Sequence, residues 1–107
     1  TLRRSQPLEI EKELRALGVI VRLYDPLAKP EEVADITPSP FSRDPYEAAA
    51  GSEVILIMTP SPDFKNLDFR KLKAAAKTPV LFDTCNILCS REKDIKSAGF
   101  RYLSVGR

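Results

Sequence analysis

Polar side chains that could do chemistry stand where the predicted strands of this chain end. Asp25 ends one apolar run, and Asp83, Cys85 and Asn86 follow another. Ligands in open α/β sheets bind beyond the carboxyl ends of the strands, so these side chains are candidates for ligand contact. Structural roles are the alternative, because aspartate and asparagine also initiate turns and a cysteine in a turn needs no catalytic role.

The composition excludes several kinds of chemistry. The chain contains no histidine, so it has no imidazole base to activate a thiol and no imidazole metal ligand. Cys85 and Cys89 form a Cys-x3-Cys pair, which matches neither zinc-ligand spacing nor a redox Cys-x-x-Cys motif. Phosphate-binding Gly-x-Gly-x-x-Gly and Walker loops are also absent from the sequence. We therefore predict reduced thiols, no metal site and no catalytic role for Cys85.

The charge and hydropathy patterns narrow the class of partner. Lys and Arg number 17 and Asp and Glu number 15, so the formal net charge is +2. Nucleic-acid binders carry a larger and more clustered basic excess, so no nucleic acid is predicted as a partner. No apolar run approaches the roughly 20 residues of a membrane span, and the sequence does not open with a signal-peptide pattern. These patterns predict a cytoplasmic protein with no membrane partner.

The positions of the glycines predict the fold class. Helix-forming segments end at Gly18, Gly51 and Gly99, and a β-branched or aromatic run follows each of them. Glycine tolerates the positive φ at which many helices end. A fourth helical segment ends at Thr78 and Pro79, before a further apolar run. The alternation predicts one α/β domain over residues 1–107. Its Rossmann-like, doubly wound sheet is mainly parallel, with about four strands and helices on both faces.

The apolar runs predict where the strands lie. They span residues 19–24, 54–58, 80–82 and 100–105. The continuously apolar 54–58 run is typical of a central strand, whereas the alternation in 100–105 indicates an edge strand. Residues 25–44 are predicted to form a loop, with a helical turn at 31–34 and a short extended piece at 36–37.

The start of the chain departs from the usual order of elements. The first helix is predicted to begin near Pro7, and its charged side chains, Glu11 and Arg15 among them, are predicted to face water. A doubly wound domain normally opens with a strand, so we expect that its first strand is missing here. The 19–24 and 54–58 strands would then pair directly with each other, or a second copy would supply the pairing.

Several short motifs occur in a characteristic order along the chain. They are Arg-Arg-Ser-Gln-Pro-Leu-Glu-Ile at 3–10, Tyr-Asp-Pro at 24–26, Asp-Pro-Tyr-Glu-Ala at 44–48, Thr59 with Phe64, Leu-Asp-Phe at 67–69, Phe-Asp-Thr-Cys-Asn-Ile-Leu at 82–88, and Ala-Gly-Phe-Arg-Tyr through Gly-Arg at 98–107. Together they resemble the C-terminal UDP-binding domain of the UDP-glucose/GDP-mannose (nucleotide-sugar) 6-dehydrogenase family. The resemblance runs the whole length of the chain.

This resemblance implies a function for the domain. It implies a nucleotide-sugar-binding domain of an NAD-dependent enzyme that oxidises the primary alcohol of a UDP-sugar to the uronate. Arg3 would reach the NAD, which is bound mainly by an absent N-terminal domain, and Asp83, Cys85 and Asn86 would lie at the substrate. The implied partners are a UDP-sugar, the preceding NAD-binding and central domains, and a second copy in a homodimer. The family's catalytic residues belong to the preceding domains, so the isolated domain is predicted to be inactive.

Two departures from the family pattern bear on these expectations. The family's opening strand and its lysine are absent, and Cys85 stands where the family has an arginine that contacts the nucleotide sugar. A thiol cannot replace the charge-assisted hydrogen bonds of a guanidinium. The alternative function is a stand-alone Rossmann-like module that binds a nucleotide or a protein partner without enzymatic activity.

Overall fold

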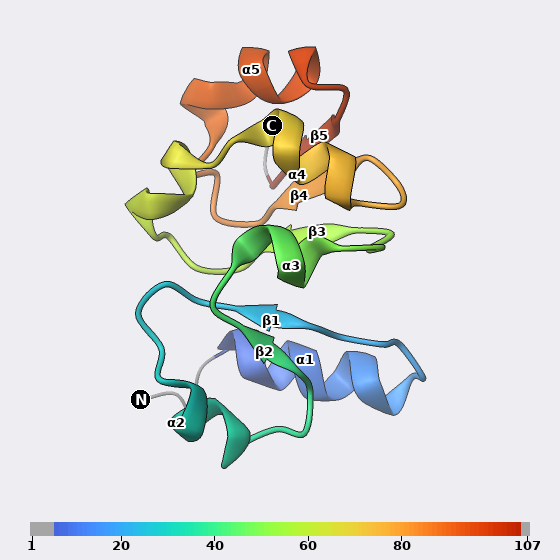
Figure 1. The fold of residues 1–107 in the computed structure, drawn as a ribbon, viewed down its shortest axis with the longest axis vertical. Coiled ribbons are helices and arrows are strands. Elements are labelled where there is room, and N and C mark those ends of the chain that lie inside the picture. The colour runs from blue at the N-terminus through green and yellow to red at the C-terminus, as the bar shows by residue number, and fades with distance from the viewer. Residues whose placement is uncertain (1–5, 106–107) are drawn as a thin grey trace. The chain divides into compact units, whose positions relative to one another are not determined.

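The computed structural model describes residues 6–105, in which helices and strands alternate along the chain (Figure 1). The helices are α1 (Gln6–Ala16), α2 (Pro30–Ala34), α3 (Pro45–Ala49), α4 (Phe69–Ala75) and α5 (Glu92–Ser97), with 3₁₀ helices η2 (Pro62–Asn66) and η3 (Cys89–Arg91). The strands are β1 (Leu23–Tyr24), β2 (Phe41–Ser42), β3 (Ile55–Ile57), β4 (Val80–Asp83) and β5 (Arg101–Ser104). The chain forms two compact units, one ending at Ala48 and the other beginning at Ala49.

A parallel pair of short strands organises the N-terminal unit. Leu23 and Tyr24 of β1 pair with Phe41 and Ser42 of β2, and the Leu23 amide donates to the Pro40 carbonyl at 2.9 Å. Parallel strands need a crossover connection, and α2 lies within that connection. Pro30 begins α2, which suits the first turn of a helix because proline has no amide to leave unpaired.

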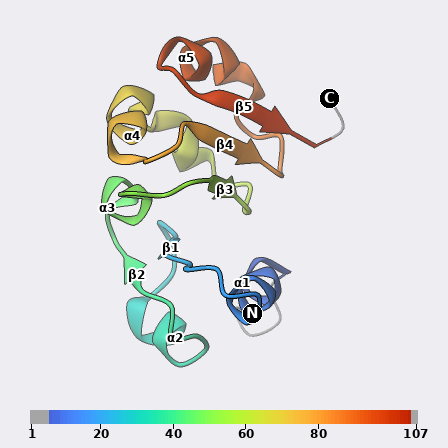
Figure 2. The same ribbon diagram turned by 90° about the vertical axis from the view of Figure 1, so that its right-hand side faces the viewer.

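The C-terminal unit contains a three-stranded parallel sheet with the order β3-β4-β5. Leu56 pairs with Phe82, which in turn pairs with Leu103, so these three side chains form a row across the sheet. Figure 2 shows α4 and α5 on one side of this sheet. Fully buried Leu81 and Ile95 belong to the core between the sheet and these helices.

Burial alternates along the strands of this sheet. Ile57, Leu81 and Tyr102 are buried, whereas Leu56 is 39% exposed and Leu103 is 38% exposed. The alternation follows from the pleat, which directs successive side chains to opposite faces. The predicted edge strand is therefore confirmed in β5. Within the C-terminal unit, β3 is the first strand of the sheet order, and Leu56 is exposed on the face opposite the core.

The predicted helix ends are confirmed. Gly18, Gly51 and Gly99 have φ values of 87°, 69° and 107°. After α5, the Gly99 amide donates to the Lys96 carbonyl and the Phe100 amide donates to the Ile95 carbonyl. These bonds satisfy carbonyls that the end of the helix leaves unpaired.

The strand predictions for the N-terminal part were partly wrong. Of residues 19–24, only Leu23 and Tyr24 join a ladder. The extended piece expected at 36–37 lies instead at β2, because the Ile36 and Thr37 amides both donate to the Val33 carbonyl and so close the end of α2. Among the described residues β1 pairs with β2 within the N-terminal unit, and β3 pairs with β4 within the C-terminal unit. The expected pairing of the 19–24 and 54–58 strands, directly or through a second copy, stays a prediction.

Candidate functional site

A buried carboxylate holds the loop that follows β4. Asp83, the last residue of β4, is 0% exposed. Its Oδ1 accepts a hydrogen bond from the Cys85 amide at 3.2 Å. Its Oδ2 accepts from the Leu88 amide at 2.7 Å and from the Tyr102 hydroxyl at 2.8 Å. Both carboxylate oxygens are therefore occupied, and Asp83 fixes the shape of the segment that we call the 84–88 loop.

Two further side chains attach the 84–88 loop to the strands on either side. The Thr84 hydroxyl donates to the Ile57 carbonyl at 2.7 Å, at the end of β3. The Asn86 amide Nδ2 donates to the Val105 carbonyl at 2.7 Å, just after β5. Asn86 adopts a φ of 55°, a conformation that asparagine tolerates better than most residues. The loop thus lies at the carboxyl ends of all three strands, where open α/β sheets bind ligands.

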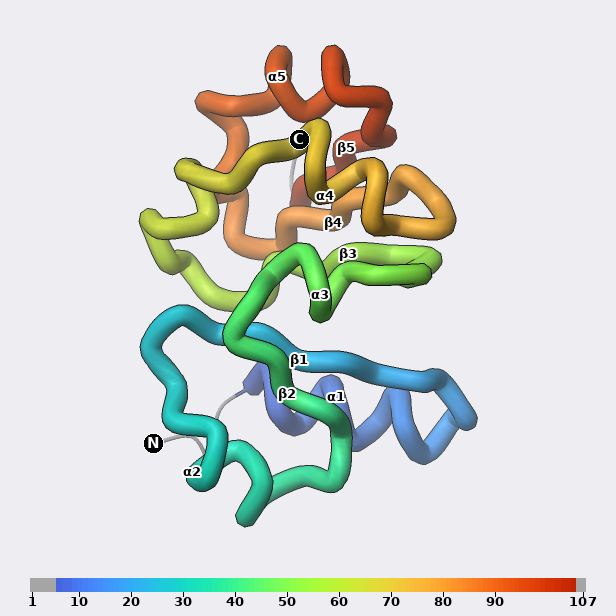
Figure 3. The backbone as a smooth tube through the Cα atoms, in the orientation of Figure 1, coloured from blue at the N-terminus to red at the C-terminus, as the bar shows by residue number. Residues whose placement is uncertain are grey.

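Both cysteines lie in or next to this loop, and both are free and half-buried. The Cys85 thiol is 3.8 Å from the Thr84 hydroxyl. The Cys89 thiol, at the start of η3, is 3.6 Å from the Tyr102 hydroxyl. Figure 3 traces the chain from β4 through this loop to η3 and α5. Burial and the contacts with Cys89 and Asp83 raise the pKa of the Tyr102 phenol well above its usual value, so its hydroxyl stays protonated.

The structure brings Asp83, Cys85 and Asn86 together, as their sequence proximity requires, but it gives them different environments. Asp83 is enclosed, Cys85 is half-buried and Asn86 is exposed. Asp25 belongs to the N-terminal unit, where its Oδ1 accepts from the Leu27 amide at 2.8 Å and makes the turn that its sequence context allowed. Arg3 lies outside the described residues.

Thr84 and Tyr102 were missed as site residues, although both stand in recognisable motifs. Thr84 stands in the Phe-Asp-Thr-Cys-Asn-Ile-Leu stretch at 82–88, and Tyr102 stands in the Ala-Gly-Phe-Arg-Tyr stretch that leads into β5. The available signal for Tyr102 was its position two residues after Phe100 in an alternating run, since this spacing places both side chains on the same face. A buried tyrosine hydroxyl needs a partner, and the Asp83 carboxylate supplies one.

A second polar cluster lies in the N-terminal unit. Glu11 is 3% exposed, so the prediction that it faces water is wrong. Its Oε2 accepts from the Arg15 guanidinium at 2.6 Å and from the Ser39 hydroxyl, while its Oε1 has no hydrogen-bond partner among the described residues. The helical period could have revealed this, because Glu11 stands three residues after buried Leu8 and shares its face.

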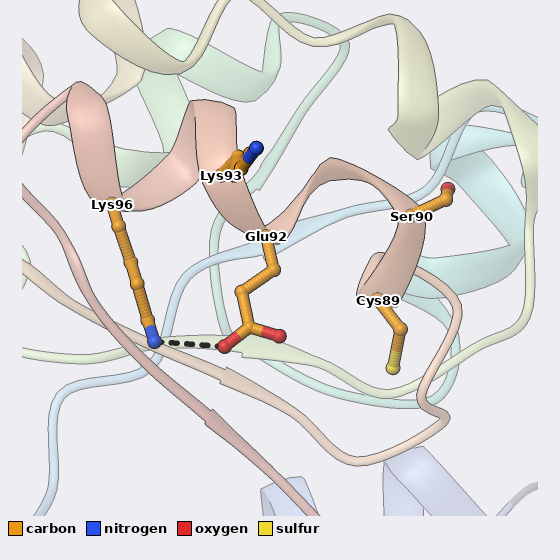
Figure 4. A pocket seen from close by; sticks show the side chains of 5 residues that line it. All are labelled: Cys89, Ser90, Glu92, Lys93 and Lys96. Carbon is orange, nitrogen blue, oxygen red and sulfur yellow. Dashed lines mark ion pairs between the residues drawn. The ribbon is translucent and has the colours of Figure 1, made fainter.

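One open depression lies along η3 and α5. Its volume is about 370 Å³, and it is lined by Cys89, Ser90, Glu92, Lys93 and Lys96. Figure 4 shows Lys96 paired with Glu92. The Lys96 Nζ lies 2.8 Å from the Glu92 Oε2. Within residues 6–105 no cluster of three or more cysteine or acidic side chains could hold a metal ion. No helix in this part of the chain is long and apolar enough to cross a membrane.

Comparison with known proteins adds a family match and several relatives. Residues 1–90 match the family described as "UDP-glucose/GDP-mannose dehydrogenase family, UDP binding domain". The UDP-glucose 6-dehydrogenase of Rhizobium meliloti is 38% identical over 106 residues, which cover 99% of this chain and 24% of that protein.

Two further relatives show the same coverage. The UDP-glucose 6-dehydrogenase TuaD of Bacillus subtilis is 36% identical over 106 residues, covering 97% of this chain and 23% of that protein. The UDP-glucose 6-dehydrogenase of Bos taurus is 27% identical over 121 residues, covering 98% and 24%. The chain therefore spans about a quarter of the length of these relatives.

Proposed function

The chain belongs to the UDP-glucose/GDP-mannose dehydrogenase family as a UDP binding domain, and on that basis we propose that its 84–88 loop binds the nucleotide part of a UDP-sugar. The observation that carries this assignment is the attachment of the loop to all three strands at their carboxyl ends. Asp83 holds the loop to the end of β4, Thr84 holds it to the end of β3, and Asn86 holds it to Val105 just after β5. A loop that is already ordered loses less conformational entropy when a ligand binds.

The chemistry available at the loop is neutral hydrogen bonding. Cys85 replaces the guanidinium that its family motif carries, and Asp83 is fully occupied by its own donors. Ligand contact therefore falls to Asn86, which is exposed, and to the half-buried Thr84 and Cys85. These groups suit the hydroxyls and base edges of a nucleoside or sugar better than they suit a phosphate, which favours arginine or helix N-termini.

We place the oxidation itself in the complete polypeptide. The proposed reaction is the NAD-dependent oxidation of a UDP-sugar primary alcohol to the carboxylate, and this chain would contribute substrate binding only. Its relatives are about four times as long. The additional residues of such a polypeptide are enough to form NAD-binding and central domains and the surfaces of a homodimer.

The described residues do not fit a dinucleotide. The glycines stand singly at positions 18, 51, 99 and 106, and the first three end helices rather than forming a glycine-rich cradle. The NAD would therefore be held by other domains. Arg3 is the one residue of this chain proposed to reach it.

Calorimetric titration of the chain with UDP, UDP-glucose, GDP-mannose and NAD tests the proposal. We expect heat from UDP and UDP-glucose and none from NAD. The Asn86→Gly variant keeps the positive φ but removes the exposed amide together with its bond to the Val105 carbonyl, and should weaken UDP binding about fivefold. The matched control is Asn66→Ala, at an exposed asparagine in η2, which should leave the affinity unchanged. Absence of heat from every uridine nucleotide would overturn the assignment.

A further inference from the structure

Tyr102 differs from the other groups that contact Asp83. The Cys85 and Leu88 donors are backbone amides, which every residue at those positions would supply. Among the described residues the Tyr102 hydroxyl is the one side-chain donor to Asp83, and it comes from β5 rather than from the loop itself. Tyr102 is 9% exposed, and its position opposite Leu81 in the ladder brings its ring alongside the end of β4.

We propose that Tyr102 is a positioning residue for the UDP site, which holds the Asp83 carboxylate in place and through it the 84–88 loop. The inference rests on the proposed function, because it assigns Tyr102 a role in the binding of the same ligand. Tyr102 itself is buried beneath the loop and acts through Asp83.

The electrostatics of Asp83 explain why one hydroxyl has this influence. Among the described residues Asp83 makes no ion pair, and its surroundings include the fully buried Leu81 and Leu88. A buried carboxylate without a cation depends on its hydrogen bonds, and the loss of one donor leaves a lone pair unsatisfied. The carboxylate would then turn to recover a donor, and the Leu88 amide, which shares Oδ2 with Tyr102, would lose its acceptor.

The same hydroxyl also contacts the far end of the loop. It lies 3.6 Å from the Cys89 thiol, while Asp83 stands at the start of the loop. One side chain of β5 therefore touches the residues on both sides of the 84–88 loop. A phenylalanine would fill the same space in the core but could make neither contact.

The residue just before β5 provides a control. Phe100 is buried, as Tyr102 is, and its aromatic ring has no hydroxyl. The Phe100→Leu variant therefore disturbs core packing and lowers the overall stability without removing a donor from Asp83. The pair Tyr102→Phe and Phe100→Leu separates positioning of the loop from general destabilisation.

The experiment compares these two variants with the unmodified chain in three measurements. Hydrogen–deuterium exchange reports the Cys85 and Leu88 amides, iodoacetamide labelling followed by peptide mass spectrometry reports the Cys85 thiol, and calorimetry reports the dissociation constant for UDP. For Tyr102→Phe we expect exchange at Leu88 and labelling of Cys85 to accelerate about tenfold. UDP binding should weaken by a similar factor. For Phe100→Leu we expect a lower melting temperature with the UDP affinity and the relative exchange at the loop unchanged.

The outcomes distinguish the inference from the function on which it rests. If the unmodified chain binds no UDP, the proposed function fails and the positioning role for UDP fails with it. If the chain binds UDP but Tyr102→Phe binds within twofold of it, the inference alone is overturned. If exchange accelerated equally at all amides in both variants, Tyr102 would contribute to core packing alone, and the inference would likewise be overturned.

A second variant covers the case in which Tyr102→Phe does not fold. Asp83→Asn keeps the shape of the side chain but places an amide group where Oδ1 accepts from the Cys85 amide. The Tyr102 hydroxyl can still donate to the remaining carbonyl oxygen. We expect faster exchange at Cys85 than at Leu88 and a smaller loss of UDP affinity than in an Asp83→Ala variant. Equal protection at both amides would contradict the arrangement of donors that we infer.

Discussion

Each unit of the molecule buries one carboxylate, and the two are satisfied in different ways. In the C-terminal unit both oxygens of Asp83 accept hydrogen bonds, and all three donors are neutral. In the N-terminal unit Glu11 accepts from a cation, Arg15, and from the Ser39 hydroxyl, both on Oε2. Its Oε1 has no partner among the described residues.

The difference shows what each carboxylate can control. Two of the donors to Asp83 belong to the loop that follows it, so the carboxylate determines the path of that loop. The partners of Glu11 are side chains, one in the next turn of α1 and one far along the chain. Glu11 therefore ties a helix to a distant segment but shapes neither backbone. Buried carboxylates that organise backbone amides are the better indicators of a binding loop.

The pKa of Glu11 follows from a balance of opposing effects. Burial raises it, but the hydrogen bonds from Ser39 and Arg15 and the charge of Arg15 outweigh burial, so the pKa of Glu11 lies below its ordinary value of 4.5. A carboxyl whose pKa is lower in the folded state stabilises the fold above the unfolded-state value. That contribution disappears as the pH falls through the folded-state value.

The largest expected effect comes from removal of the better-satisfied carboxylate. Asp83→Ala leaves the Cys85 and Leu88 amides and the Tyr102 hydroxyl without their acceptor, and should cost about 4 kcal/mol of unfolding free energy. Urea denaturation measures this, with Asp63→Ala at an exposed position of η2 as the control. If Glu11→Ala proved more costly than Asp83→Ala, the contrast between the two carboxylates would be wrong.

The next effect concerns binding at the loop that Asp83 holds. Cys85→Arg restores the guanidinium of the family motif on a backbone that Asp83 already fixes. It should tighten UDP-glucose binding by about 2 kcal/mol, or roughly 30-fold, if the arginine reaches a phosphate. Calorimetry on the variant checks this, and Asn66→Arg, at an exposed position of η2, is the control for an added guanidinium charge. An unchanged dissociation constant would show that position 85 does not face the nucleotide.

A smaller effect is expected at Glu11, and it should depend on pH. Glu11→Gln keeps an acceptor for Ser39 but loses the charge that Arg15 pairs with, so it should cost about 1 kcal/mol at pH 7. The difference between the variant and the unmodified chain should shrink as the pH falls below about 4.5. Urea midpoints between pH 7 and pH 3 test this, and a difference that stayed constant with pH would show that Glu11 is not the titrating group.

The smallest effect is expected at the Cys85 thiol. It makes one weak contact, with the Thr84 hydroxyl, and no histidine in the chain can activate it. Cys85→Ser should therefore leave UDP affinity within twofold and, in the complete polypeptide, leave turnover largely intact. Loss of turnover with normal folding and substrate affinity would give the thiol a role that neither carboxylate network explains.

Much of the local structure follows from the sequence because its causes are local. The ends of the helices at Gly18, Gly51 and Gly99 depend on the φ that glycine tolerates, and the alternation in β5 depends on the pleat of a single strand. The same reasoning placed Asp83 and Asn86 at a strand end, because the end of an apolar run is visible within a few residues.

The tertiary structure alone decided what depends on residues far apart in the chain. The two-residue strand β2 has too few residues for a periodic pattern, and its pairing with β1 determines which sheet β1 joins. Glu11 is buried because a segment 28 positions later, at Ser39, packs against its helix. The Tyr102 hydroxyl reaches the Asp83 carboxylate because the register of β4 and β5 aligns the ends of these two strands. Burial and side-chain pairing depend on strand register and packing, which the sequence near each residue does not encode.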